Sequence, residues 1–174
     1  MRFSYLAAAA LAAVAGCSST TLTPGDMTVR DLVGAAQPKT VVINEVFPHG
    51  ADVLTDPDWV ELKNVSDAAV DLSGYRVRDD KTSFTLPAGT TLEPGNYLVL
   101  LCDDQPDGGG AGLHLPFKLG GGDEFYLQTS DGTKVDGVLW TVDVAPTGKS
   151  YGRLPDGTGS FSALNPTRGS RNGV

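Results

Sequence analysis

The chain has 174 residues, of which 21 are acidic and 13 are basic, so its formal net charge at pH 7 is −8. Proteins that bind nucleic acid neutralise phosphates with clustered lysine and arginine, which makes nucleic acid a poor match as a partner for this chain. The length is enough for a single domain with its own hydrophobic core. Composition therefore predicts one acidic globular domain and no nucleic-acid partner.

The first segment, residues 1–16, has the composition of an export signal. Arg2 precedes a run that is rich in alanine and contains no acidic residue. Its apolar part is roughly ten residues long, whereas a helix needs about 20 apolar residues to span a bilayer. We therefore expect a signal peptide and not a membrane-spanning helix.

This segment ends in Val14-Ala15-Gly16-Cys17, which resembles the bacterial lipobox. The resemblance implies that Cys17 becomes the first mature residue and is the lipid attachment site, with diacylglycerol on its thiol and an acyl chain such as palmitate on its amino group. Ser18 after the cysteine is similar to the signal for the outer membrane in cells that have two membranes. The prediction is a lipoprotein of the cell envelope; the alternative is an ordinary secretory signal whose cleavage site lies beside a cysteine.

Residues 17–38 are predicted to form a flexible tether. Its first part is rich in serine, threonine, glycine and proline, which bury little surface and space a domain from the lipid. Met27, Leu32 and Val33 fit one side of a short helix, although an isolated helix of this length is marginal.

From residue 39 onward the sequence predicts β-structure. In residues 59–64, Val60 and Leu62 alternate with Trp59, Glu61 and Lys63, which is typical of a strand with one buried face. Further strands with turn residues between them are expected at 40–47, 75–78, 83–86, 97–102, 125–128 and 135–140. Their inward residues predict one shared core: Val60, Leu62, Tyr75, Val77, Val99, Leu101, Phe125 and Leu127. Residues 97–102 are apolar on both faces, so we expect a second cover over that strand.

Three separated motifs occur in a characteristic order: Asn44-Glu45-Val46, the turn Asp71-Leu72-Ser73-Gly74, and a closing region at 149–157 and 165–172. Together they resemble the lamin-tail domain, an immunoglobulin-like sandwich found in nuclear lamins and in many bacterial exported proteins. The resemblance covers residues 39–172 and implies an all-β, immunoglobulin-like β-sandwich. Arg168 stands where the family usually has a second proline.

Two groups of acidic residues are candidates for a site. Asp103, Asp104 and Asp107 lie in a glycine-rich loop where a calcium ion could find oxygen ligands, but their spacing matches no known calcium loop, so we predict a solvated loop and no metal. Glu45 and Glu61 are expected to be neighbours on one sheet face. We interpret this pair as structural and not catalytic, with Arg76 or Arg78 neutralising the charge across strands.

Cys102 ends an apolar strand, where a lone cysteine is usually a small buried hydrophobic residue. As a nucleophile it would need a base, and the chain has only His49 and His114 to supply one. The glycine runs lack the Lys-Ser or Lys-Thr of a phosphate loop. We therefore predict no catalytic residue and no cofactor.

Two functions remain open. The preferred one is a lipid-anchored, non-catalytic module that binds or scaffolds an unknown protein or envelope component, with the membrane as a second partner through Cys17. The alternative is a metal-assisted hydrolase built on the same sandwich. Fold alone does not decide between them.

Overall fold

A computed structural model describes residues 39–48, 56–106 and 111–173. The predictions for the signal peptide 1–16, for the tether 17–38 and its short helix, for Cys17, and for His49 and Asp107 lie outside these residues. Within the described part of the chain, no helix has the length and apolar character that crossing a membrane requires.

The described residues form twelve β-strands and no helix. The strands expected at 40–47, 97–102 and 135–140 are present with bounds that differ by at most one residue from the prediction. The strands are β1 Val41–Phe47, β2 Asp58–Asn64, β3 Val70–Asp71, β4 Arg76–Arg78, β5 Ser83–Thr85, β6 Thr91–Leu92, β7 Tyr97–Cys102, β8 Leu113–Leu115, β9 Asp123–Gln128, β10 Lys134–Trp140, β11 Ser150–Leu154 and β12 Ser160–Leu164.

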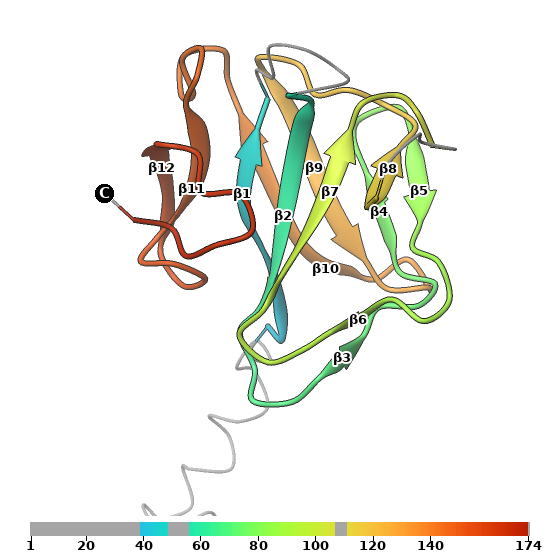
Figure 1. Cartoon of the computed structure of the whole chain (residues 1–174). Helices are drawn as coiled ribbons and strands as arrows, with labels where there is room; N and C mark the ends of the chain where they lie inside the picture. Colours follow the sequence, from blue (N-terminus) through green and yellow to red (C-terminus); the bar gives the residue numbers. More distant parts are fainter. Residues whose placement is uncertain (1–38, 49–55, 107–110, 174) are drawn as a thin grey trace, which may run out of the picture. The chain divides into compact units, whose positions relative to one another are not determined.

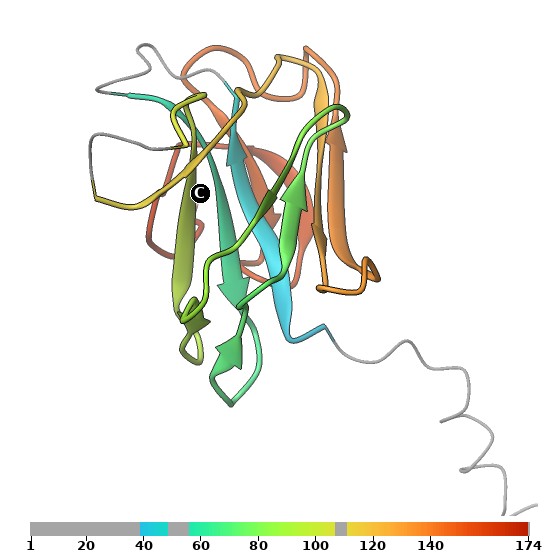
Figure 2. The ribbon, with the colours of Figure 1, turned by 90° about the vertical axis from the view of Figure 1, so that its right-hand side faces the viewer.

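The strands pair into two main sheets (Figure 1). One has six strands in the order β12-β11-β1-β2-β7-β8, and the other has four in the order β10-β9-β4-β5; β3 and β6 make a small separate pair. Seen from the side, β9 and β10 lie apart from β2 and β7 as a second layer (Figure 2). Alternate residues from both sheets fill the space between them. The predicted all-β, immunoglobulin-like sandwich is therefore confirmed.

The core confirms most of the predicted residues and corrects two of them. Val60, Leu62, Val77, Phe125 and Leu127 are buried in one cluster, and Tyr75 packs against it from a partly buried position. Val99 and Leu101 do not belong to that cluster, because they point to the opposite face of the six-stranded sheet.

On that outer face lies a second, smaller apolar cluster. Leu101 packs there with Phe47 and Trp59, Val99 borders it, and the rings of Phe47 and Trp59 stack 5.6 Å apart. The alternation of β2 predicted one buried face, whereas Trp59 is only 2% exposed. Leu101 is buried on this face, so the predicted second buried face of β7 is confirmed at the C-terminal end of the strand, whereas Val99 is only partly buried. Trp59 shows that β2 is also buried on its outer face.

The Asp71–Gly74 turn connects the two sheets and not two neighbouring strands. Asp71 accepts a hydrogen bond from the Ser73 backbone N–H at 2.8 Å, and Gly74 adopts a φ of +75° that L side chains rarely take. Leu72 at the centre of the turn is fully buried. The chain therefore passes from β2 in one sheet to β4 in the other through a turn that is anchored in the core.

One edge of the sandwich is closed by a buried carboxylate. Asp136 on β10 accepts hydrogen bonds from the Ile43 backbone N–H at 2.9 Å and from the Arg153 guanidinium at 3.0 Å, and it also pairs with Lys39. Burial opposes the charge, but these donors outweigh it and lower the pKa of Asp136. This carboxylate ties β10 of one sheet to β1 and β11 of the other.

Candidate functional site

Two glutamates occupy directly opposite positions on the central strands of the six-stranded sheet. Glu45 on β1 pairs with Glu61 on β2, and both side chains have no solvent exposure. A β-bulge between Ile43 and Glu45 inserts one extra residue, so that Asn44 and Glu45 both point to the outer face although they are consecutive. The bulge thus places an amide and two carboxylates together on the outer face.

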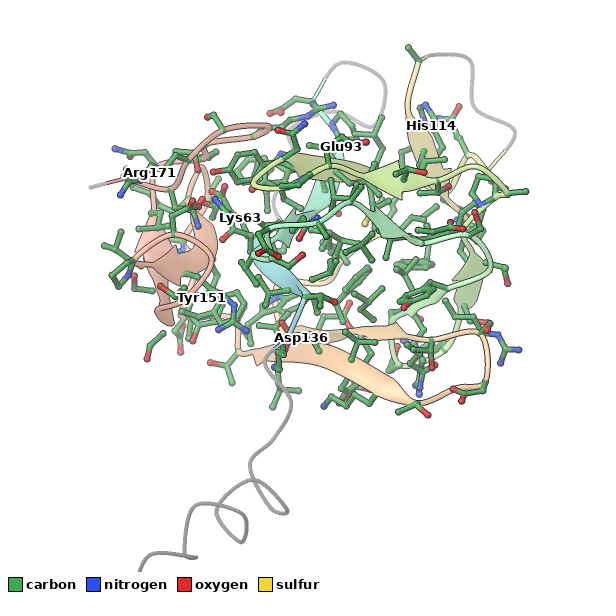
Figure 3. The ribbon with its side chains drawn as sticks, turned by 90° about the horizontal axis from the view of Figure 1, so that it is seen from below. Lys63, Glu93, His114, Asp136, Tyr151 and Arg171 are labelled. Carbon is green, nitrogen blue, oxygen red and sulfur yellow. The ribbon has the colours of Figure 1, made fainter. Side chains whose placement is uncertain are left out.

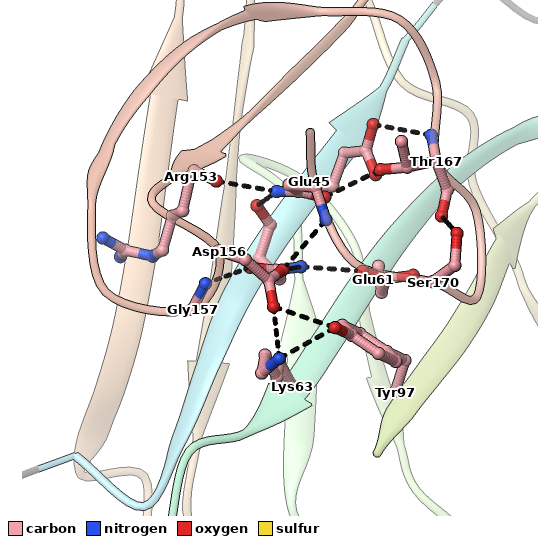
Figure 4. A network of polar contacts seen from close by, with 11 residues as sticks. Glu45, Glu61, Lys63, Tyr97, Arg153, Asp156, Gly157, Thr167 and Ser170 are labelled. Atoms are coloured by element: carbon pink, nitrogen blue, oxygen red, sulfur yellow. Dashed lines mark hydrogen bonds and ion pairs between the residues drawn. The ribbon is translucent and has the colours of Figure 1, made fainter. Parts of the chain in front are cut away.

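Donors from the C-terminal part of the chain satisfy Glu45. Its Oε1 accepts from the Ser150 hydroxyl and from the Thr167 backbone N–H at 3.1 Å. Its Oε2 lies 2.7 Å from the Thr167 hydroxyl. Both contacts to Thr167 come from the segment after β12, which reaches across to β1 (Figure 4).

Glu61 is enclosed in the same way. The Asn44 side-chain amide donates to its Oε1 at 2.9 Å, and the Gly169 backbone N–H donates to its Oε2 at 2.7 Å. We call residues 165–173 the closing segment, because its backbone covers both carboxylates.

Asn172 fixes the far end of the closing segment. Its side-chain amide donates to the backbone carbonyls of Arg153 at 2.9 Å and Asn44 at 3.2 Å, which assigns its Oδ1 as an acceptor. That oxygen lies 2.8 Å from the Thr167 hydroxyl. Thr167 therefore stands between two acceptors, Glu45 Oε2 and Asn172 Oδ1, with a single hydrogen to give.

A proton on Glu45 resolves this conflict. If Glu45 Oε2 carries the proton and donates to the Thr167 hydroxyl, that hydroxyl is free to donate onward to Asn172. The electrostatics agree, since burial raises the pKa of Glu45 despite the opposing hydrogen bonds from Ser150 and Thr167. The hydrogen-bond geometry and the desolvation therefore both favour the neutral acid at this position.

The pKa of Glu61 is also raised. Burial raises the pKa of Glu61 to about 7, against the hydrogen bonds from Asn44 and Gly169, and the nearby Glu45 and Asp156 carboxyls add to the rise. Glu45 and Glu61 therefore titrate as a coupled pair of acids that retains a proton near neutral pH.

A triad of Lys63, Tyr97 and Asp156 borders the pair (Figure 4). Lys63 forms a salt bridge with Asp156 and donates to the Tyr97 hydroxyl at 2.8 Å, which in turn donates to Asp156 at 2.8 Å. Burial disfavours both charges, but the contacts raise the pKa of Lys63 and lower that of Asp156. Asp156 also accepts from Asn44 at 3.0 Å and from the Asn172 backbone N–H at 3.1 Å, so the triad is joined to the closing segment.

The predicted neighbourhood of Glu45 and Glu61 is confirmed, but the predicted role of the arginines is wrong. Arg76 and Arg78 lie on β4 in the four-stranded sheet, and Arg78 contacts Glu124 at 3.8 Å. Neutral donors and protonation, in place of a cross-strand cation, stabilise the pair. General acid–base catalysis requires a carboxyl that the substrate can reach, and here the closing segment covers both carboxyls.

The other predicted candidates lie apart from the pair. Asp103 is 4% exposed and contacts His114 Nδ1 at 2.5 Å, while Asp104 is exposed and has a φ of +60°. His114 Nε2 is buried without a hydrogen-bond partner in the part of the chain that is described. Within residues 39–48, 56–106 and 111–173 there is no group of three or more His, Cys, Asp and Glu residues suited to a metal.

Cys102 is buried at 1% exposure in the main core, and desolvation raises the pKa of its thiol well above the ordinary value. His114 pairs with Leu101 in the β7–β8 register, and Leu101 belongs to the outer cluster. The thiol and the imidazole therefore lie on opposite faces of the sheet. This confirms that Cys102 is a small buried core residue.

Sequence reasoning missed the residues that enclose the pair: Lys63, Tyr97, Ser150, Asp156, Thr167, Gly169 and Asn172. For the residues within 149–172, the sequence showed only a resemblance to the closing motif of the family and predicted no structural role. The one local signal was Asn44 before Glu45 on a strand otherwise made of β-branched and apolar residues, since a buried polar pair requires partners from elsewhere.

The comparisons with known proteins agree with this architecture. A family model for the Lamin Tail Domain matches residues 34–141, which is more than half of the chain. The match includes Asn44-Glu45-Val46 and the Asp71–Gly74 turn and ends before β11. No curated protein matches the chain. The chain therefore belongs to the lamin-tail-domain family.

Proposed function

We propose that this protein is a lipid-anchored binding or scaffolding module of the cell envelope that performs no catalysis. The observation that carries the non-catalytic part is the enclosure of Glu45 and Glu61, which have no solvent exposure and whose oxygens accept from Thr167 and Gly169 of the closing segment. A lamin-tail domain of the immunoglobulin-like type is generally a recognition module, which supports the same reading.

The anchoring part rests on the sequence around Cys17. The apolar run before it is too short to span a bilayer, and the small residues at 15 and 16 suit cleavage next to the cysteine. A single acyl chain binds a membrane only marginally, whereas two or more chains anchor a protein stably, with about 0.8 kcal/mol for each buried methylene. Ser18 supports the outer membrane as the destination in a cell that has two membranes.

Cys17→Ser tests the anchor, and the chain offers a matched control because its other cysteine is buried in the core. Cells grown with labelled palmitate should incorporate the label into the wild type and into Cys102→Ala, and both proteins should remain in the membrane fraction. Cys17→Ser should lose the label and leave the membrane fraction. An unmodified Cys17 thiol, or a Cys17→Ser variant that stays bound as the wild type does, would refute the lipid anchor.

A substrate screen tests the absence of catalysis against the metal-assisted hydrolase. The purified protein is assayed with esterase, phosphodiesterase and glycosidase substrates, with and without divalent metals. We expect no turnover above the rate of a heat-denatured sample. Turnover that Glu61→Gln, His114→Ala or Cys102→Ser abolishes would replace the binding module by an enzyme.

A further inference from the structure

The outermost strand of the six-stranded sheet has one open side. β12 (Ser160–Leu164) pairs with β11 and with no other strand among the described residues. The backbone N–H and C=O groups on its far side also make no hydrogen bond to any described residue. An edge strand in this state can accept a further strand through main-chain hydrogen bonds.

The other edges are less suited to this. β8 and β5 have three residues each, which is too short to hold a partner strand firmly. β10 has seven residues, but the hollow beside it contains Asp80, Asp123 and Glu124, and its buried Asp136 already ties it to β1. β12 therefore combines a usable length with a free edge.

A pocket of about 320 Å³ lies along β12. Leu154, Ala163 and Leu164 give it an apolar lining, and Lys149, Asn165 and Gly173 form its polar part. In strand addition, main-chain hydrogen bonds supply affinity while pockets for alternate side chains supply specificity. The pocket is placed to take one apolar side chain of a strand that is paired with β12.

The charge around this edge is opposite to that of the chain as a whole. Residues 149–174 contain four basic side chains and one acidic side chain, whereas the complete chain has a net charge of −8. Arg153 is neutralised by Asp136, but Lys149 and Arg171 are exposed and form no ion pair with any described residue. We call these two cations the basic rim. Arg168 is not part of it, because its neighbours Thr167 and Gly169 lie over β1 and β2, where they donate to Glu45 and Glu61. Figure 3 shows Arg171 at the outer margin of the domain, on the side of β11.

We propose that β12 accepts an extended, acidic segment of a partner protein as an added strand, with an apolar residue in the pocket and carboxylates facing Lys149 and Arg171. This inference rests on the proposed binding function and names the surface and the class of partner. Five residues of β12 correspond to about 17 Å of strand. Opposite charges along the rim would fix the direction and register of the incoming segment.

Hydrogen–deuterium exchange on the full-length protein, anchored in phosphatidylcholine vesicles, tests the proposal. The added ligand is a synthetic peptide of about ten residues in which valine alternates with glutamate; its counterpart has lysine in place of glutamate. We expect the glutamate peptide to slow exchange at residues 160–164 and the lysine peptide to leave it unchanged. Binding should weaken as salt is raised, because the rim charges are exposed.

Charge reversal supplies the matched control. Lys149→Glu and Arg171→Glu together should weaken binding of the glutamate peptide about tenfold or more. The double variant Arg76→Glu and Lys118→Glu changes the net charge equally at exposed positions elsewhere and should bind nearly as the wild type does. Equal weakening in both double variants would mean that net charge, and not this edge, attracts the peptide, and would overturn the proposal.

Three other outcomes would also overturn it. Slowed exchange at a different edge would support the proposed binding function but would show that β12 is not the binding surface. Slowed exchange at β12 without peptide, increasing with protein density on the vesicle, would identify a second copy of the chain as the occupant. Slowed exchange without peptide in phosphatidylglycerol vesicles only would assign the basic rim to an anionic lipid surface.

Discussion

Glu45 and Glu61 face one another across β1 and β2 with no solvent exposure, and the backbone of the closing segment donates to both of them. Two buried carboxyls without a cation in contact would repel each other strongly if both were ionised. Here the structure stabilises them by neutral donors and by retaining a proton. The pair therefore joins the C-terminal end of the domain to its two central strands. We call Glu45 and Glu61, together with their donors from the closing segment, the carboxylate lock.

Thr167→Val should remove one hydrogen-bonding group of the carboxylate lock. The substitution keeps the shape of the side chain and removes the hydroxyl that joins Glu45 to Asn172, so both partners lose a hydrogen bond in a buried position. We expect the free energy of unfolding to fall by about 1–3 kcal/mol. Urea titration followed by tryptophan fluorescence measures it. Thr158→Val changes the same group at an exposed position and should be nearly neutral; equal losses in both variants would contradict the lock.

Alternation and turn residues predicted the sandwich, because inward positions such as Leu62 and Phe125 follow the strand period of two. They could not predict the bulge at Asn44, since a single inserted residue shifts the face of every following side chain without leaving a pattern of its own. They assigned Val99 and Leu101 to the main core because a strand that is apolar on both faces does not show which side meets the opposite sheet.

The partners of Glu45 and Glu61 were harder still to predict. Contacts such as those of Thr167 and Gly169 join residues more than 100 positions apart, and local spacing carries no information about them. β11 and β12 were not expected as strands, because serines and a glycine interrupt their sequences and a proline follows soon after each of them. The prediction that arginines neutralise the glutamates placed Arg76 and Arg78 on the wrong sheet for the same reason.

Asp136→Asn should loosen the edge where the two sheets meet. An amide there can accept fewer of the bonds from Ile43, Lys39 and Arg153 and presents its own N–H groups to cations. Loss of one partner from a buried ion pair costs about 3 kcal/mol or more. Because the pKa of Asp136 is lowered on folding, this stabilisation is present above pH ~3.8 and is lost as the pH falls through the folded pKa.

Thermal unfolding at pH 7 measures the effect, and Asp143→Asn at an exposed position is the control. Loss of stability confined to Asp136→Asn at pH 7, which shrinks as the pH falls below about 3.8, is the expected result. A variant that melts at the wild-type temperature would show that Asp136 does not hold the sheets together.

Leu62→Ala tests the position of the main core. Leu62 is fully buried between the sheets, so its truncation removes apolar contacts and leaves a cavity. We expect a loss of roughly 2–5 kcal/mol in the free energy of unfolding. Leu139 is 68% exposed, and Leu139→Ala should change stability by less than about 0.5 kcal/mol. Equal effects at the two positions would contradict the core as described.

The pH dependence of stability tests the carboxylate lock most directly. The folded pKa of Glu61 is about 7 and its ordinary value is 4.5, so folding favours the protonated acid. Its contribution is therefore fully present below about pH 4.5 and is lost as the pH rises through about 7, by at most about 3 kcal/mol. Glu61→Gln is neutral at every pH and should remove this loss, while the exposed Glu93→Gln should retain it.

The decisive measurement is a series of urea titrations between pH 4.5 and pH 8 on the wild type, Glu61→Gln and Glu93→Gln. The lock predicts that the stability advantage of the wild type over Glu61→Gln shrinks or reverses across this range, while the difference between the wild type and Glu93→Gln stays constant. A constant difference between the wild type and Glu61→Gln would show that Glu61 binds no extra proton on folding and would contradict the protonated, enclosed pair.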